Sequence, residues 1–193
     1  MKEVWIFITD GFADWEASYV STELNNPENR FQVRTIAIDK DPKVSMGGLR
    51  VLPDYELNDE PSQDKLAMLI IPGGTGWREA KNQQAARLVR NCIDKDIPVA
   101  AICDATTFLA THGFLDNIKH TGNTLGFLKE GAPNYRGESY YQTVQSVSDG
   151  NIITANGTAA LEFSRHILEK LGVYEGEKLE EWYTVFKKGY LSE

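Results

Sequence analysis

The 193-residue sequence has few of the residues from which disulfide frameworks and metal sites are built. It contains two cysteines, Cys92 and Cys103, and three histidines. Two thiols do not make the disulfide framework of a small secreted domain, and such a chain is expected in a reducing compartment. The cysteines and histidines also lack a zinc-ligand spacing such as C-x-x-C. We therefore expect a cytoplasmic protein without a metal and without a cofactor.

Long apolar runs and an excess of basic residues are missing as well. No segment approaches the roughly 20 apolar residues of a membrane-spanning helix, and the apolar run near the start is too short for a secretory signal. The 20 basic residues are outnumbered by 28 acidic ones, which gives a net charge of −8. Nucleic acids and anionic membranes are bound mainly through Lys and Arg. We expect neither as a partner.

The sequence does contain short apolar runs that alternate with helical patterns. Residues 4–8, 66–71 and 99–102 are continuous apolar runs, which is typical of strands that are buried on both faces. Such strands between helices predict an α/β fold, with a mostly parallel sheet between two helical layers. Further strands are expected at 31–38, 141–147 and 151–154, a hairpin at 43–51, and helices at 14–24, 85–93, 105–111, 158–171 and 178–186. Residues 119–141 are expected to hold a short strand and a short helix.

Cys103 is the first candidate for chemistry. It stands between an apolar strand and a predicted helix in the segment V-A-A-I-C-D-A-T-T, which is the layout of a nucleophile elbow. A helix N-terminus favours the thiolate and predicts a lowered thiol pKa. The alternative is a small apolar residue that fills space at a strand end. Cys92 lies on the apolar face of a helix and is interpreted as structural.

Three further groups are candidates for the same site. The loop P-G-G-T-G at 72–76 is either a simple turn or a source of backbone amides for an oxyanion, with the Asp104 amide as a second donor. Glu16, predicted within the first turns of a helix that Asp14 caps, either complements the helix dipole or donates a hydrogen bond to a Cys103 thiolate. The second role requires a raised carboxyl pKa. His120 is either a base for Cys103 or a partly exposed loop residue.

The order of these motifs resembles the ThiJ/PfpI family, within the class I glutamine amidotransferase-like superfamily. The resemblance covers roughly residues 2–172 and depends on I-F-I followed by Glu16, on L-I-I-P-G-G, on A-A-I-C and on I-T-A-N-G-T. It implies a flavodoxin-like three-layer sandwich and a homodimer. It also implies Cys103 as the reactive residue, Glu16 as its carboxyl partner, and the amides of Gly74 and Asp104 as the oxyanion hole.

Two departures from the family pattern narrow the expected function. The protease-like branch has His directly after the cysteine, where this chain has Asp104, and other members have a His about 20 residues later, where either His120 or Asn123 stands. The late His and Glu of the amidotransferases are absent, so glutamine hydrolysis is not expected.

We expect a cysteine-dependent, stress-related enzyme in which Cys103 attacks a small carbonyl or acyl substrate, as a hydrolase, glyoxalase or deglycase does. The alternatives are a redox-sensing stress protein that acts through Cys103 oxidation, an intracellular peptidase-like protein, and a binding or scaffold module without catalysis. Residues 1–193 are interpreted as a single domain, with a C-terminal helix at about 175–190 as an extension.

Overall fold

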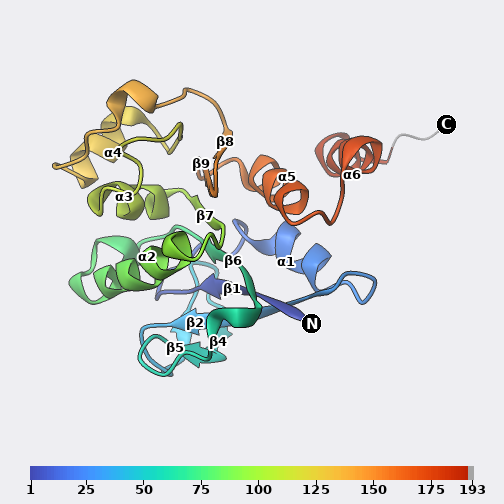
Figure 1. The fold of residues 1–193 in the computed structure, drawn as a ribbon, viewed down its shortest axis with the longest axis horizontal. Helices are drawn as coiled ribbons and strands as arrows, with labels where there is room; N and C mark the ends of the chain where they lie inside the picture. Colours follow the sequence, from blue (N-terminus) through green and yellow to red (C-terminus); the bar gives the residue numbers. More distant parts are fainter. Residues whose placement is uncertain (191–193) are drawn as a thin grey trace.

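The apolar runs of the sequence form the middle of a seven-stranded sheet in a computed structural model that describes residues 1–190 (Figure 1). The strand order is β5-β2-β1-β6-β7-β9-β8. Every neighbouring pair is parallel except β8 and β9, which form an antiparallel pair. The strands are β1 (Lys2–Phe7), β2 (Phe31–Ala37), β5 (Tyr55–Glu56), β6 (Leu66–Ile71), β7 (Val99–Ile102), β8 (Ser146–Asp149) and β9 (Ile152–Ala155).

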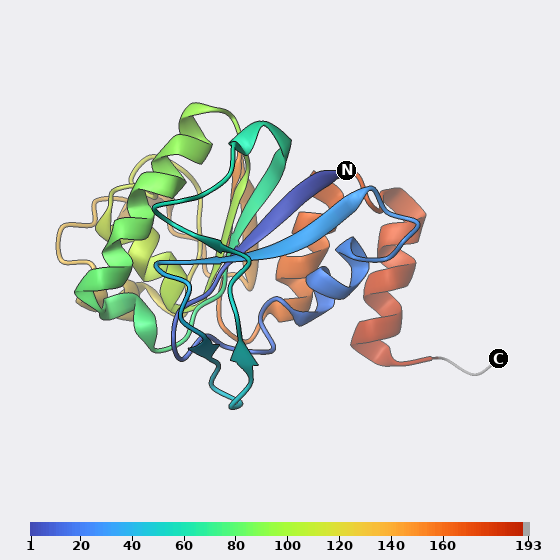
Figure 2. The same ribbon diagram turned by 90° about the horizontal axis from the view of Figure 1, so that it is seen from below.

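Helices cover both faces of this sheet, as Figures 1 and 2 show. One face carries α1 (Ser18–Leu24), α5 (Ala160–Lys170) and α6 (Gly176–Lys188), and the other carries α2 (Ala86–Asp94), α3 (Asp104–Thr111) and α4 (Leu125–Gly131). Short 3-10 helices lie at η1 (Gln63–Lys65), η2 (Gly76–Arg78), η3 (Ala80–Ala85) and η4 (Glu138–Tyr140). The predicted flavodoxin-like sandwich is confirmed.

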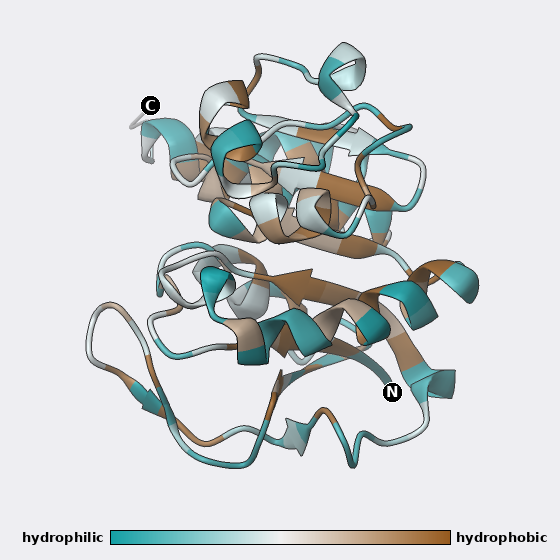
Figure 3. Ribbon diagram, turned by 90° about the vertical axis from the view of Figure 1, so that its left-hand side faces the viewer, coloured by the Kyte–Doolittle hydropathy of each residue, from teal (hydrophilic) through white to brown (hydrophobic). Residues whose placement is uncertain are grey.

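Alternation along the strands builds one core on each side of the sheet. Trp5 and Phe7 pack with the α2 and α3 side, whereas Val4, Ile6 and Ile8 pack with the α1 and α5 side. Successive side chains of a strand point to opposite faces, so a fully apolar strand supplies both cores. Figure 3 shows brown strands at the centre, with teal segments on the helices in front of them. The sheet therefore gives the site a rigid floor.

Several local predictions need correction. Helix α1 begins at Ser18 and has no side-chain cap, because Asp14 instead accepts hydrogen bonds from Ser45 Oγ and the Gly47 amide. The short strand β5 was not predicted. The hairpin is confirmed as β3 (Lys43–Val44) and β4 (Arg50–Val51). Between 119 and 141 the structure has helix α4 but, in place of a strand, only an isolated bridge between His120 and Tyr141.

The C-terminal helix packs against the rest of the molecule. Leu179 and Trp182 of α6 are buried, whereas Phe186, predicted on the same face, is 47% exposed. Within residues 1–190, no helix has the length and apolar character that crossing a membrane requires.

The strand order reverses between β1 and β6, which lie side by side at the centre. From β1 the chain moves outward to β2, and from β6 it moves the other way to β7. Loops that follow two such strands separate and leave a crevice at the carboxyl ends of the strands, where open α/β sheets bind ligands. The loops after β1, β6 and β7 contain Glu16, the P-G-G-T-G segment and Cys103.

Candidate active site

Cys103 occupies the sharp turn that the sequence predicts. Its backbone has φ 59° and ψ −131°, and its amide donates to the Ala155 carbonyl at 3.0 Å. A residue with a side chain rarely adopts positive φ, and such strain persists only where the surroundings impose it. Here the positive φ is imposed by the hydrogen bond to Ala155 at the end of β9 and by the start of helix α3 at Asp104. The thiol is thereby presented at the carboxyl edge of the sheet.

Two glycines enclose the cysteine so closely that no other residue fits. A Cβ on Gly73 would lie 2.5 Å from the Cys103 Cβ, and a Cβ on Gly157 would lie 2.9 Å from its Sγ. Contacts below 3.0 Å are not tolerated, so a side chain at either position would displace the thiol. Gly157 belongs to the I-T-A-N-G-T motif, but its contact with the sulfur could not be read from the sequence.

Glu16 lies in the turn before α1, not within the helix, and it is completely buried. The Gly73 amide donates to its Oε2 at 2.5 Å, and Oε1 has no nitrogen or oxygen partner among residues 1–190. Burial raises the pKa of the carboxyl to about 7, against the hydrogen bonds from Gly73 and Cys103. The nearby Asp104 charge raises this pKa further. Near neutral pH the protonated and ionised forms of this carboxyl are therefore both populated.

The pKa of the Cys103 thiol differs from the prediction. Burial and the charge of the Glu16 carboxylate raise this pKa, although hydrogen bonds from Asn123 and from the Asp104 amide lower it. The lowering of the thiol pKa that the helix N-terminus predicts is therefore outweighed by burial and by the Glu16 charge. When Glu16 carries a proton, its charge is absent and the thiolate is less disfavoured. The two groups therefore titrate as a pair rather than independently.

Asn123, and not His120, contacts the sulfur. Asn123 Nδ2 donates to Cys103 Sγ at 3.4 Å, and its Oδ1 accepts from the Gly157 amide at 2.9 Å, which fixes the orientation of the side-chain amide. His120 is buried, with Nδ1 2.7 Å from the Ile118 carbonyl and Nε2 2.6 Å from the Tyr135 hydroxyl. Both ring nitrogens are thus occupied elsewhere. His120 is neither a base for Cys103 nor an exposed loop residue.

The Gly74 amide, predicted as part of an oxyanion hole, lies beside Phe12 at the edge of the pocket. Gly74 pairs with Phe12 in a bridge in which the neighbouring residues make the hydrogen bonds, Ala13 to the Gly73 carbonyl at 3.3 Å and Thr75 to the Gly11 carbonyl at 3.1 Å. Within the described residues, the Gly74 amide donates to no acceptor. It lines the same pocket as Cys103 and Asp104. Backbone donors so placed receive a developing negative charge.

The thiol opens into a pocket of about 460 Å³. Trp15, Met46 and Phe127 form its apolar walls, and Arg78 and Asp104 add charged groups. Trp15 Nε1 donates to the Gly157 carbonyl at 3.1 Å, which holds the indole beside the elbow. These wall residues come from separate loops, and no local motif in the sequence marks them. The pocket accommodates a small molecule.

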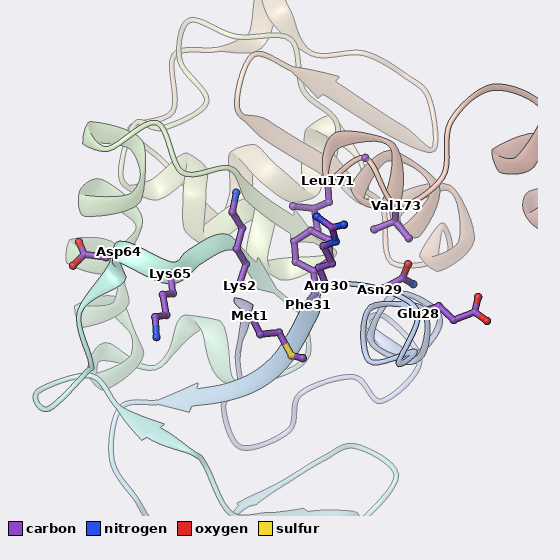
Figure 4. A pocket seen from close by; sticks show the side chains of 11 residues that line it. Met1, Lys2, Glu28, Asn29, Arg30, Phe31, Asp64, Lys65, Leu171 and Val173 are labelled. Atoms are coloured by element: carbon purple, nitrogen blue, oxygen red, sulfur yellow. The ribbon is translucent and has the colours of Figure 1, made fainter.

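A larger pocket of about 760 Å³ is lined by Lys2, Phe31, Lys65 and Leu171, among others (Figure 4). Lys2 and Phe31 begin β1 and β2, so this pocket lies at the amino ends of the strands. None of its lining residues is a cysteine or a histidine. The smaller pocket, which contains the Cys103 thiol, is therefore the candidate site.

A profile of the DJ-1/PfpI family matches residues 2–170 of this chain. The chain belongs to the DJ-1/PfpI family. Two relatives from Bacillus subtilis, both named uncharacterized proteases, are similar to this chain over nearly its whole length. YoaZ is 35% identical over 96% of this chain and 91% of its own, and YdeA is 37% identical over 98% and 93%.

Solved structures of the DJ-1/PfpI family agree with the fold. A ThiJ/PfpI family protein from Bacillus anthracis is 36% identical and superposes with a TM-score of 0.92, covering 98% of this chain and 92% of its own. A DJ-1 superfamily protein from Agrobacterium tumefaciens is 33% identical, with a TM-score of 0.88 and coverage of 96% and 97%. The resemblance stated from the motifs is thus confirmed.

Proposed function

We propose that the protein is an enzyme in which Cys103 attacks a small carbonyl or acyl compound. The observation that carries this proposal is the strained elbow itself. It places the thiol near a buried carboxyl group with a pKa of about 7 and in a pocket of about 460 Å³ that the Gly74 amide, which has no acceptor within residues 1–190, also lines. A buried polar arrangement of this kind costs stability and is typical of functional sites.

The chemistry follows from the proton that Glu16 and Cys103 share. With the proton on Glu16, the thiolate attacks the carbonyl carbon, a C–S bond forms, and the π electron pair moves to the carbonyl oxygen. The amides of Gly74 and Asp104 receive this oxygen, and the Asn123 amide holds the sulfur in place before the attack. The proton of Glu16 then passes to the oxygen, which gives a neutral adduct and leaves Glu16 as a carboxylate.

The peptidase-like alternative is less well supported. The position after the cysteine is occupied by Asp104, whose carboxylate pairs with Arg78 at 3.3 Å. His120 is occupied by Tyr135 and Ile118, so no imidazole is placed to protonate a leaving amine. The names of the two Bacillus subtilis relatives suggest proteolysis for those proteins. The site in this chain favours small carbonyl compounds instead.

The matched pair Cys103→Ser and Cys92→Ser tests the proposal. Cys92 is completely buried, and burial raises its thiol pKa to about 12, so it is unreactive near neutral pH. We expect Cys103→Ser to abolish turnover of glyoxals and small activated esters, and Cys92→Ser to retain it. Turnover that survives in Cys103→Ser would overturn the proposal.

A redox role is the second candidate, favoured by the unpartnered Oε1 of Glu16 next to the sulfur. With hydrogen peroxide as the oxidant, the thiolate attacks one peroxide oxygen, an S–O bond forms, the O–O bond breaks, and the two-electron oxidation gives a sulfenate and water. Protonated Glu16 would then donate to the oxidised sulfur. We expect mass spectrometry after mild peroxide treatment to find oxygen on Cys103 and none on Cys92. Equal oxidation of both cysteines would contradict this role.

We also propose a cytoplasmic homodimer, as the resemblance implies. Both cysteines are free thiols. Met46, Leu49 and Leu52, on and beside the β3–β4 hairpin, are 52%, 60% and 68% exposed, and a second copy that covered them would bury apolar surface. In sedimentation experiments, Leu49→Glu should yield monomers while Val144→Glu, at a residue 53% exposed elsewhere, should not. A wild-type monomer would contradict the dimer.

A further inference from the structure

Arg78 is the only basic residue that lines the Cys103 pocket within residues 1–190. It ends the 3-10 helix η2, which follows the P-G-G-T-G loop, and its side chain is 46% exposed. The carboxylates that line the same pocket are Glu16, Asp104 and Glu130. Among the described residues that line this pocket, Arg78 is therefore the one side chain that can attract an anionic group of a substrate.

Two neighbours fix the Arg78 side chain. Its Nε donates to Asp104 Oδ2 at 3.3 Å, and its guanidinium carbon lies 4.8 Å from the centre of the Phe127 ring. The Asp104 side chain is only 9% exposed, so this anchor is itself held by the fold. A guanidinium fixed by an ion pair and an aromatic ring loses little further freedom when it binds a ligand.

The terminal nitrogens of Arg78 remain open. Only Nε makes a hydrogen bond or ion pair with the described residues, so the Nη groups have no acceptor there. Arg78 lines both the Cys103 pocket and the adjoining pocket, so these donors are available to a ligand in the Cys103 pocket. Glu130 is the competing acid at this end of the pocket, but it is exposed and forms no ion pair with Arg78. An open guanidinium fork matches the two oxygens of a carboxylate. Because the Arg78 side chain is 46% exposed, solvent screens part of the attraction in such a pair.

We propose that Arg78 is a specificity-determining residue that selects substrates with a carboxylate next to the electrophilic carbon, as in 2-oxo acids. Arg78 and Cys103 line the same pocket, and Asp104, which anchors Arg78, follows Cys103 in the chain, so a small ligand held by Arg78 occupies the pocket into which the thiol opens. This inference rests on the proposed attack by Cys103. Trp15 and Met46 form apolar walls for the remainder of the substrate.

The test compares two alkylating reagents of nearly equal size, iodoacetate and iodoacetamide. Each forms a C–S bond with the Cys103 thiolate and releases iodide, but only iodoacetate carries a carboxylate. We expect Arg78→Gln to lower the ratio of the two rate constants, iodoacetate over iodoacetamide, about tenfold, the size expected for one charge-assisted pair at a half-exposed site. The ratio cancels any general change in thiol reactivity.

Arg90→Gln is the matched control, because Arg90 also lies over an aromatic ring, that of Phe114 at 4.6 Å, but outside the pocket. Its ratio should equal that of the wild type. Arg78→Lys, which retains the charge and loses the fork, should give an intermediate ratio and also serves if Arg78→Gln does not fold. An unchanged ratio in both Arg78 variants would overturn the inference.

Alkylation does not require turnover of any substrate, so this result is independent of the enzymatic proposal. A lowered ratio without any carbonyl turnover would support the anion site at Arg78 and contradict the proposed reaction. Turnover that depends on Cys103, with an unchanged ratio, would retain the reaction and remove the role of Arg78.

Discussion

At the scale of single residues, the acid–base chemistry proposed for this site depends on one proton that Glu16 and Cys103 share. The buried carboxyl of Glu16 has a pKa raised to about 7, and its charge raises the pKa of Cys103 in turn. Asn123 contacts the sulfur with a side-chain amide, which does not ionise at ordinary pH and so cannot act as an acid or a base. Acid–base behaviour at the sulfur is therefore set by the carboxyl–thiol pair and not by an imidazole.

Replacing Glu16 should simplify the titration of Cys103. In the wild type we expect the alkylation rate to change with pH in two steps, one of them near 7, because both groups ionise. In Glu16→Gln the carboxylate charge that raises the thiol pKa is absent. We therefore expect a single step at lower pH than the alkaline step of the wild type, measured as iodoacetamide rate against pH.

Cys103→Ser provides the blank for this measurement, since any remaining rate belongs to other groups. Superimposable profiles for the wild type and Glu16→Gln would show that the two groups are not coupled.

Single site residues could be predicted from the sequence where a chemically distinctive residue directly follows an apolar strand. Cys103, Glu16 and the P-G-G-T-G loop each follow an apolar strand, so the parallel sheet brings them together. His120 was a wrong choice as a base because its burial under Tyr135 is a tertiary feature. Trp15, Arg78 and Phe127 reach the pocket only through the folding of separate loops, and no spacing along the chain predicts that.

At the scale of elements, continuous apolar runs predicted the central strands well, because a strand covered on both faces must be apolar throughout. The start of α1 was predicted poorly. Asp14 resembles a helix cap in sequence, but its carboxylate binds the β3–β4 hairpin across the site instead. The preference of Asp14 for a helix cap was outweighed by this contact with residues more than 30 positions away, which local sequence patterns do not reveal.

Helix α6 offers a test of how an appended element is fixed. Trp182 is 9% exposed and its Nε1 donates to Glu23 at 2.9 Å, whereas Phe186 on the same helix is 47% exposed. We expect Trp182→Ala to lower the free energy of unfolding by about 3 kcal/mol, through lost burial and the lost hydrogen bond to Glu23, which keeps its hydrogen bond from Tyr174. Phe186→Ala should cost about 1 kcal/mol. Urea denaturation measures both, and equal losses would contradict the packing of α6.

At the scale of the molecule, one sheet with a core on each side accounts for the stability, and the buried carboxyl of Glu16 works against it. The fold, including its membership of the DJ-1/PfpI family, followed from the motifs. The interpretation of residues 1–193 as one domain stays a prediction, and residues 191–193 lie outside the described part of the chain.

Stability should therefore depend on pH through Glu16. Its folded pKa of about 7 lies above the ordinary value of 4.5, so the stabilising protonated form is fully present below pH 4.5 and is lost as the pH rises through 7. Between pH 5 and pH 8 we expect the wild type to lose about 2.5 kcal/mol relative to Glu16→Gln. Urea denaturation of both proteins at the two pH values measures this difference, and parallel curves would contradict it.

Trp15 gives the pocket an optical signal of its own. The indoles of Trp5, Trp77 and Trp182 are 1%, 2% and 9% exposed, whereas Trp15 is 48% exposed and stands in the pocket wall. A soluble quencher such as acrylamide will therefore reach the fluorescence of Trp15 in preference to the other three. A ligand that fills the pocket will shield this indole, so the occupancy of the pocket can be followed by light even in a Cys103→Ser protein that performs no reaction.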